Sequence, residues 1–241
     1  MKTSKTNAFT LIELLVVISI IAILAGIALP VFGAVQIKGA QTKALSNAKQ
    51  IGTALKLYAV DNAGLFPSYQ LSGGKPANPP VDVTTSNDAL CQVIPDYIPT
   101  EDIFWLAKSK WCTGTGPDNQ LDSPMVSPSN QTLAKGENEW AYVLELTDTS
   151  NSSMPMLTDG FTNGGEKTHT YAVDQTVQGG VWQAKAAVIV HVDCSAIIAK
   201  VDKQTLTVQG YNGGVAVGDI YDTSSGDKGW LGKTNLCVNP K

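Results

Sequence analysis

The chain has 241 residues, of which 43% are hydrophobic and 16% charged, which suits one medium-sized domain and excludes a disordered or collagen-like chain. Its formal net charge is −4, and all 17 basic residues are lysines. Because arginine supplies the bidentate fork used on phosphates and guanines, no nucleic acid is expected as the primary ligand.

A strongly apolar run follows the first eight residues, which carry Lys2 and Lys5 and no acid. From Leu14 to Val35 there are fourteen Leu, Ile, Val or Phe residues, and their membrane insertion is favourable by about 6 kcal/mol in total. The positive flank is expected on the cytoplasmic side, with the rest of the chain facing outward. Glu13 costs about 2.5–3.5 kcal/mol at bilayer depth, so the span tolerates this acid but leaves it in need of a partner.

The segment AFTLIELLVV, residues 8–17, resembles the prepilin cleavage and methylation motif of type IV pilins and type II secretion pseudopilins. The resemblance implies that a prepilin peptidase cuts between Ala8 and Phe9 and that the new amine of Phe9 is methylated. Glycine is the commonest family residue before the cut, where this chain has Ala8. In a filament, the Glu13 carboxylate would meet the Phe9 amine of a neighbouring subunit, since an unpaired charge in an apolar bundle is costly.

Two other interpretations explain the apolar run but give Glu13 no role. In the first, residues 14–24 are the core of an ordinary secretory signal, with Gly26-Ile27-Ala28 as its small-residue cleavage site and Leu29 as the new terminus. In the second, the run is an uncleaved membrane anchor, for which its length suffices.

An amphipathic helix is predicted to continue beyond Val35, and the whole helix is expected from about Phe9 to Asn62, a length of about 80 Å. Its inner half would be buried by lipid or other subunits, and its outer half by the globular domain of the same chain. Apolar positions then recur with spacings of four, three, four and three residues, which predicts one buried face. These positions are Ala44, Ala48, Ile51, Leu55 and Tyr58.

Pro30 lies between Gly26 and Gly33 and predicts a kink or a locally unwound segment in the helix. The family resemblance implies that this segment can extend when subunits pack. A passive transmembrane proline kink is the alternative. Gly39 and Gly52 are further weak points of the helix, and the sequence assigns them no role.

The long helix is predicted to end at Asn62-Ala63-Gly64, just before Pro67. Residues 72–82 and 113–131 are expected as loops, and residues 86–94 and 100–107 as short helices, the second capped by Thr100.

Four later segments are rich in β-branched and aromatic residues and are predicted to contain strands: residues 139–147, 181–193, 196–202 and 204–211. The expected fold class is α+β and pilin-like, with one long N-terminal helix packed on an antiparallel sheet. The expected organisation is a leader over residues 1–8, a membrane and stalk helix over 9–63, and a globular domain over 64–241.

Four cysteines occur without any close pairing of the kind that binds zinc: Cys91, Cys112, Cys194 and Cys237. If this part of the chain is exported, two disulfides are expected. Three pairings are possible, and sequence proximity alone favours Cys91 with Cys112 and Cys194 with Cys237.

The sequence does not predict an enzyme. His169 and His191 could be combined on paper with Asp174, Asp193 and a serine, but neither a GxSxG nor an HExxH motif occurs. The two histidines are therefore expected at surface or strand positions, and no catalytic residue is assigned.

No cofactor is expected, although calcium is considered for the segment GDIYDTSSGDKG, residues 218–229. Asp219, Asp222 and Asp227 could supply hard oxygen ligands there, but their spacing does not fit an EF-hand. A solvated acidic turn is the alternative, so no metal ligand is assigned.

The expected function is that of a structural subunit of a type II secretion pseudopilus or a type IV pilus-like filament. Its partners would be further copies and other pilins or pseudopilins, the prepilin peptidase and methyltransferase, and an inner-membrane assembly platform. The precursor would cross the bacterial inner membrane once, with its C-terminal domain in the periplasm. The alternatives are a surface type IV pilin for adhesion, motility or DNA uptake, and a secreted binding or catalytic domain with an ordinary signal peptide.

Overall fold

The computed structural model describes residues 10–69, 71–72, 75–76, 83–122, 131–162, 169–212, 215–222, 231 and 235–241. Its contacts divide the chain into two compact units, one ending at Thr42 and the other running from Lys43 to Lys241. The long N-terminal helix contributes to both units, and each unit is described separately below.

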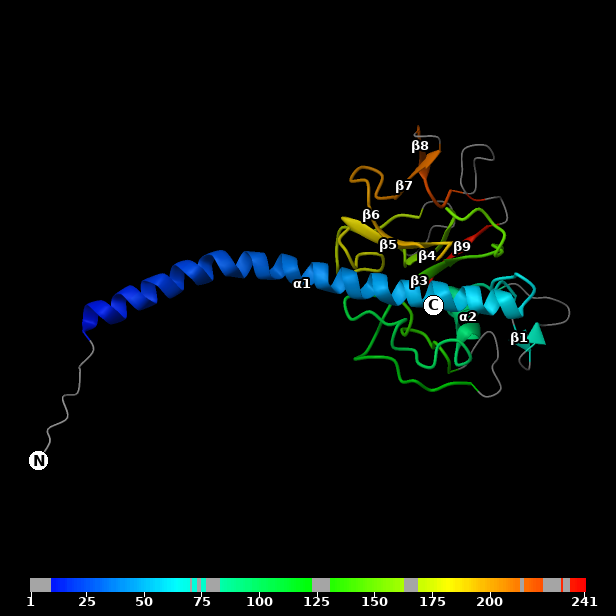
Figure 1. Cartoon of the computed structure of the whole chain (residues 1–241), viewed down its shortest axis with the longest axis horizontal. Coiled ribbons are helices and arrows are strands. Elements are labelled where there is room, and N and C mark those ends of the chain that lie inside the picture. The colour runs from blue at the N-terminus through cyan, green and yellow to red at the C-terminus, as the bar shows by residue number, and fades with distance from the viewer. Residues whose placement is uncertain are drawn as a thin grey trace, which may run out of the picture. The chain divides into compact units, whose positions relative to one another are not determined.

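Helix α1 runs without interruption from Leu11 to Asp61 and has 51 residues, as Figure 1 shows from blue to cyan. It ends where the sequence predicts. The amide of Asn62 donates to the Tyr58 carbonyl at 3.0 Å, and the amide of Gly64 donates to the Ala59 carbonyl at 2.8 Å. Gly64 has a φ of 83°, the left-handed conformation that commonly closes a helix.

The second half of α1 buries the predicted face within the Lys43–Lys241 unit. Ala44, Ala48, Ile51 and Leu55 are completely buried, which confirms the periodic pattern. Tyr58 is only half-buried, because its hydroxyl reaches the edge of the core and donates to Gln92 Oε1 at 3.0 Å.

Gly52 lies where α1 approaches the sheet most closely. A Cβ atom at this position would lie 2.7 Å from Val190 Cγ1 on strand β5 (Ala186–His191) and 3.6 Å from Met156 Cε on strand β4 (Pro155–Asp159). Gly52 therefore has a packing role that the sequence analysis did not assign, since it lets the helix lie directly against these two strands.

The main sheet is antiparallel and has five strands in the order β6-β5-β4-β3-β9. Strand β3 spans Trp140–Val143, β6 spans Ala196–Lys200 and β9 spans Cys237–Val238. The register places Trp140 opposite Asp159, Leu157 opposite Val190 and Val188 opposite Ile198. A long helix with an antiparallel sheet is the α+β, pilin-like layout that the sequence predicts (Figure 1).

Two small hairpins accompany the main sheet. Strands β1 (Leu71–Ser72) and β2 (Lys75–Pro76) form one, within the segment expected as a loop. Strands β7 (Gln209–Asn212) and β8 (Val215–Asp219) form the other.

One of the two predicted short helices is present. Residues 86–94 form α2 (Ser86–Leu90) and the 3-10 helix η1 (Cys91–Val93), with Thr85 as the N-cap accepting from the amide of Asp88. The predicted helix over residues 100–107 is wrong, because this segment forms separate turns. Its backbone finds tertiary partners instead: the Phe104 carbonyl accepts from the amide of Glu139 at 2.9 Å.

The structure leaves the two expected disulfides unconfirmed. All four cysteines lie within the described residues, and no disulfide joins any two of them. Cys237 on β9 and Cys194 just after β5 are separated by three strand spacings, about 14 Å, whereas a disulfide requires Cα atoms within about 7 Å. Three of the thiols contact backbone: Cys91 Sγ donates to the Asp88 carbonyl, Cys112 Sγ accepts from the Leu106 amide, and Cys194 Sγ donates to the Gly52 carbonyl.

Candidate functional site

The first half of α1 presents an uninterrupted apolar surface. From Leu11 to Ile37, every described Leu, Ile, Val and Phe side chain is exposed, by 41% at Ile37 and up to 78% at Leu11. We call residues 11–37 the apolar segment. Isolated exposed apolar residues are normal in soluble proteins, but a continuous surface of this length marks a contact with lipid or protein.

By length and composition, α1 is able to cross a bilayer, and it is the one helix in the described part of the chain with this property. At 1.5 Å per residue, the apolar segment spans about 40 Å, which exceeds the hydrocarbon core of about 30 Å. The apolar segment can therefore serve both as a membrane anchor and as a surface for packing against other helices.

Glu13 forms a capping box with Thr10 at the start of α1. The Glu13 carboxylate oxygen Oε2 accepts from the Thr10 amide and from the Thr10 hydroxyl, both at 2.8 Å. In return, the Glu13 amide donates to Thr10 Oγ1 at 3.3 Å. The interaction satisfies donors that the first helical turn leaves unpaired and places a negative charge at the positive end of the helix.

The sequence analysis missed this cap, although the Thr10-x-x-Glu13 spacing is its usual signature. An ionised carboxylate has room for about four hydrogen bonds, of which Oε2 uses two here. Glu13 can therefore keep its cap on α1 and still accept an ammonium group from another chain. Ala8 and Phe9, the predicted cleavage and methylation positions, lie outside the described residues.

Pro30 does not interrupt the helix, because the backbone is helical from Leu11 to Asp61. The predicted locally unwound segment is thus absent from the isolated chain. Gly26 and Gly33, on either side, have open space where a Cβ atom would be. Unlike Gly52, which is already packed against the sheet, these two glycines leave room for the close approach of another helix.

The structure gives the two histidines different polar partners. His169 is buried, contrary to the surface or strand position expected for it, and its Nδ1 lies 3.0 Å from Asp219 Oδ2. His191 ends strand β5, as expected, and its Nδ1 lies 3.1 Å from Ser195 Oγ. Asp174 bonds instead to the hydroxyl and amide of Thr176.

The calcium loop considered from the sequence is only partly described. Asp219 contacts His169 and accepts from the Tyr221 amide at 3.1 Å, so its carboxylate already has protein partners. Asp227 lies outside the described residues. The calcium prediction at this loop therefore stays untested.

The N-terminal region matches the family model described as the prokaryotic N-terminal methylation motif, over residues 3–29. No curated protein and no solved structure matches the chain. The motif covers the predicted cleavage position, Glu13 and most of the apolar segment. The chain thus carries the signature of the type IV pilin and pseudopilin family, which points to a structural subunit rather than an enzyme.

Proposed function

We propose that this protein is a filament subunit of a type II secretion pseudopilus or a related type IV pilus-like fibre. The prepilin peptidase would cut the precursor after Ala8, and Phe9 would be methylated. The observation that carries the proposal is the combination of the methylation motif over residues 3–29 with an exposed apolar segment on the same helix.

In the precursor, the flank carrying Lys2 and Lys5 stays on the cytoplasmic side of the inner membrane, and the Lys43–Lys241 unit lies in the periplasm. Extraction of the apolar segment from lipid would expose seventeen Leu, Ile, Val and Phe side chains, too large an apolar surface to face water. Packing against other copies buries that surface again. Assembly therefore replaces lipid with the apolar helices of other copies as the surroundings of the apolar segment.

Glu13 sets the register of this packing. Its carboxylate accepts the methylated amine of Phe9 from a neighbouring copy, so both charges are neutralised inside the apolar bundle. The cap by Thr10 holds the carboxylate in place before the partner arrives. Loosening of the helix around Pro30 in the filament would then adjust the spacing between packed helices.

Glutamine at position 13 separates capping from charge pairing. Glu13→Gln keeps the capping box, because glutamine also accepts from the Thr10 amide, but it removes the charge. Glu13→Ala removes both. We expect both variants to insert in the inner membrane at wild-type levels and to yield at least about tenfold fewer filaments when the subunit is overproduced with its assembly machinery.

Glu145→Gln, an exposed substitution in the globular domain, is the matched control and should assemble like the wild type. Wild-type filament yield from Glu13→Gln would contradict the charge pairing. A soluble, monomeric product from the wild-type precursor would contradict the filament proposal itself. Long fibres on the cell surface, instead of short periplasmic ones, would favour a surface pilin over a secretion pseudopilus.

A further inference from the structure

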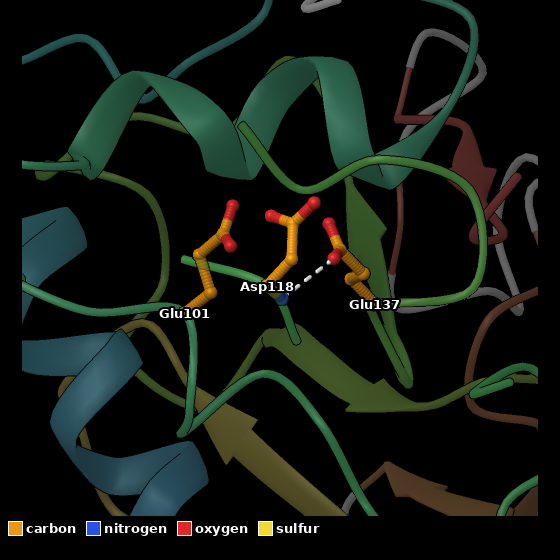
Figure 2. Close-up of side chains that lie close together, drawn as sticks. All are labelled: Glu101, Asp118 and Glu137. Carbon is orange, nitrogen blue, oxygen red and sulfur yellow. Dashed lines mark hydrogen bonds between the residues drawn. The ribbon is translucent and has the colours of Figure 1, made fainter. Parts of the chain in front are cut away.

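Three acidic side chains from separate segments meet in the globular domain. Glu101 lies in the turns over residues 101–104, Asp118 lies in the loop over residues 113–122, and Glu137 precedes strand β3. One carboxylate oxygen of each residue lies within 4.8 Å of those of the other two. Figure 2 shows the three carboxyl groups side by side, with Asp118 in the middle.

Backbone amides hold these carboxylates in place. The amide of Leu133 donates to Glu101 Oε1 at 2.6 Å, and the amide of Gln120 donates to Asp118 Oδ1 at 2.8 Å. Glu137 accepts at both of its oxygens, from the amide of Asp118 at 3.0 Å, drawn as a dashed line in Figure 2, and from the amide of Ala134 at 2.7 Å. Backbone amides, and not side-chain donors, therefore fix the orientation of the three carboxylates.

In the described part of the chain, no lysine or histidine forms an ion pair with these three carboxylates. Within the described residues, the ion pairs join His169 to Asp219 and Lys241 to Asp88, and none involves the cluster. Amide donors stabilise carboxylates but bring no net positive charge. Three like charges this close repel one another unless a cation or a proton neutralises part of the charge.

Glu101 supplies an independent observation. Its side chain is completely buried, and its Oε2 atom has no hydrogen-bond partner within the described part of the chain. A buried carboxylate oxygen without a partner is costly and rare in native proteins.

We propose that Glu101, Asp118 and Glu137 bind a divalent cation, specifically Ca²⁺. Calcium takes oxygen ligands at about 2.3–2.6 Å, so one ion can contact oxygens up to about 5 Å apart. The set contains no nitrogen or sulfur ligand, which disfavours zinc. Asp118 is exposed, which leaves coordination positions for the several waters or carbonyls that complete a calcium shell.

The ion connects three segments that otherwise have little regular structure. It ties the turns at residue 101 and the loop at residue 118 to the segment at residue 137, just before strand β3 of the main sheet. Cation binding would therefore stabilise this side of the domain, a role distinct from the assembly function of α1. None of its three residues belongs to the segment 218–229 that the sequence analysis considered for calcium.

Titration of the full chain with calcium tests the site. The protein, purified in uncharged detergent micelles and stripped with EDTA, is titrated with CaCl₂ in a calorimeter and its thermal unfolding is followed with and without calcium. We expect one ion per chain and a higher unfolding temperature with calcium, and a smaller response to the same concentration of MgCl₂, which prefers strict octahedral geometry.

Two variants locate the ion. Asp118→Asn changes an exposed residue, and Glu101→Gln keeps the acceptor for the Leu133 amide. Each should weaken calcium binding at least about tenfold, since affinity depends on the number of charged ligands. Asp96→Asn, an exposed substitution outside the cluster, should bind like the wild type.

Absence of any calcium effect on the wild type would overturn the proposal. So would an equal response to magnesium, or wild-type binding by both Asp118→Asn and Glu101→Gln, which would place the ion elsewhere.

Discussion

Small residues at positions 44, 48 and 52 lie on one face of α1, because four residues are close to one helical turn. Ala44, Ala48 and Gly52 are all buried, and Gly52 meets Val190. The sequence identified the two alanines as part of an apolar face but treated Gly52 as a weak point. A four-residue spacing of small side chains was the signal that could have revealed the close helix-sheet contact.

Gly52→Ala tests this contact. Alanine favours a helix by up to about 1 kcal/mol over glycine, but its Cβ would lie 2.7 Å from Val190 Cγ1 on a stiff, buried side chain. Overpacking costs about 1–3 kcal/mol, so we expect the free energy of unfolding to fall by about 1 kcal/mol. Gly39→Ala, where no atom lies within 4 Å, should not destabilise the protein. Equal effects of the two substitutions in chemical denaturation would contradict the contact.

Asp159 lies buried beside Glu139 in the core of the sheet. Its Oδ2 accepts from the indole of Trp182 at 2.9 Å and from the amide of Val188 at 2.6 Å. Burial raises the pKa of Asp159 despite these donors, and burial together with the charge of Asp159 raises the pKa of Glu139. The folded protein thus binds protons more tightly than the unfolded chain, so this pair lowers stability as the pH rises above the ordinary carboxyl pKa.

Asp159→Asn removes one charge of the pair and keeps an oxygen acceptor for Trp182 and Val188. We expect the free energy of unfolding to increase by about 1–3 kcal/mol at pH 8, with a smaller gain at pH 5, where the carboxyls of the wild-type pair are protonated. Urea unfolding at the two pH values measures the difference. A variant less stable than the wild type at pH 8 would show that the charged pair is favourable.

At the scale of elements, the long helix and most strands could be predicted because their patterns are local. Periodic apolar residues and the Asn62-Ala63-Gly64 terminus are sufficient to define the outer half of α1. Strand β4 was missed, since it is buried along its whole length, begins with Pro155 and has no alternation of polar and apolar residues. The turns at residues 100–107 were mistaken for a helix because their backbone partners, including Glu139, lie far away in the sequence.

For the candidate sites too, features that are contiguous in the sequence could be predicted, and features that only the fold brings together could not. The methylation motif is a contiguous sequence and could be recognised, as could the apolar segment. The cluster of Glu101, Asp118 and Glu137 could not, because irregular loops bring its members together. The favoured pairing of Cys194 with Cys237 conflicts with the strand order for a related reason, since proximity in sequence does not determine which strands are neighbours.

Packing of α1 on the sheet predicts unequal effects of two neighbouring leucines. Leu55 is completely buried, whereas Leu57 is 51% exposed on the same helix. Leu55→Ala should lower the free energy of unfolding by about 2–5 kcal/mol through lost apolar contact and a cavity. Leu57→Ala should change it by less than about 0.5 kcal/mol. Chemical denaturation of the two variants compares them directly, and similar losses would contradict the assigned face.

At the scale of the whole molecule, the two compact units have different surfaces. The unit from Lys43 to Lys241 contains the sheet and the buried core, whereas the apolar segment exposes its side chains. A chain beginning at Lys43 should therefore be soluble without detergent, monomeric, and cooperatively folded. Size-exclusion chromatography and circular dichroism would measure this, and aggregation or loss of structure would show that the domain depends on the first 42 residues.

The central claim is that the N-terminus is processed as a prepilin and not as a secretory signal. The most direct test is the intact mass and N-terminal sequence of the mature chain isolated from cells. The account predicts a chain that begins with N-methylated Phe9 and retains the apolar segment. A chain beginning at Leu29, or one that still carries residues 1–8, would contradict it.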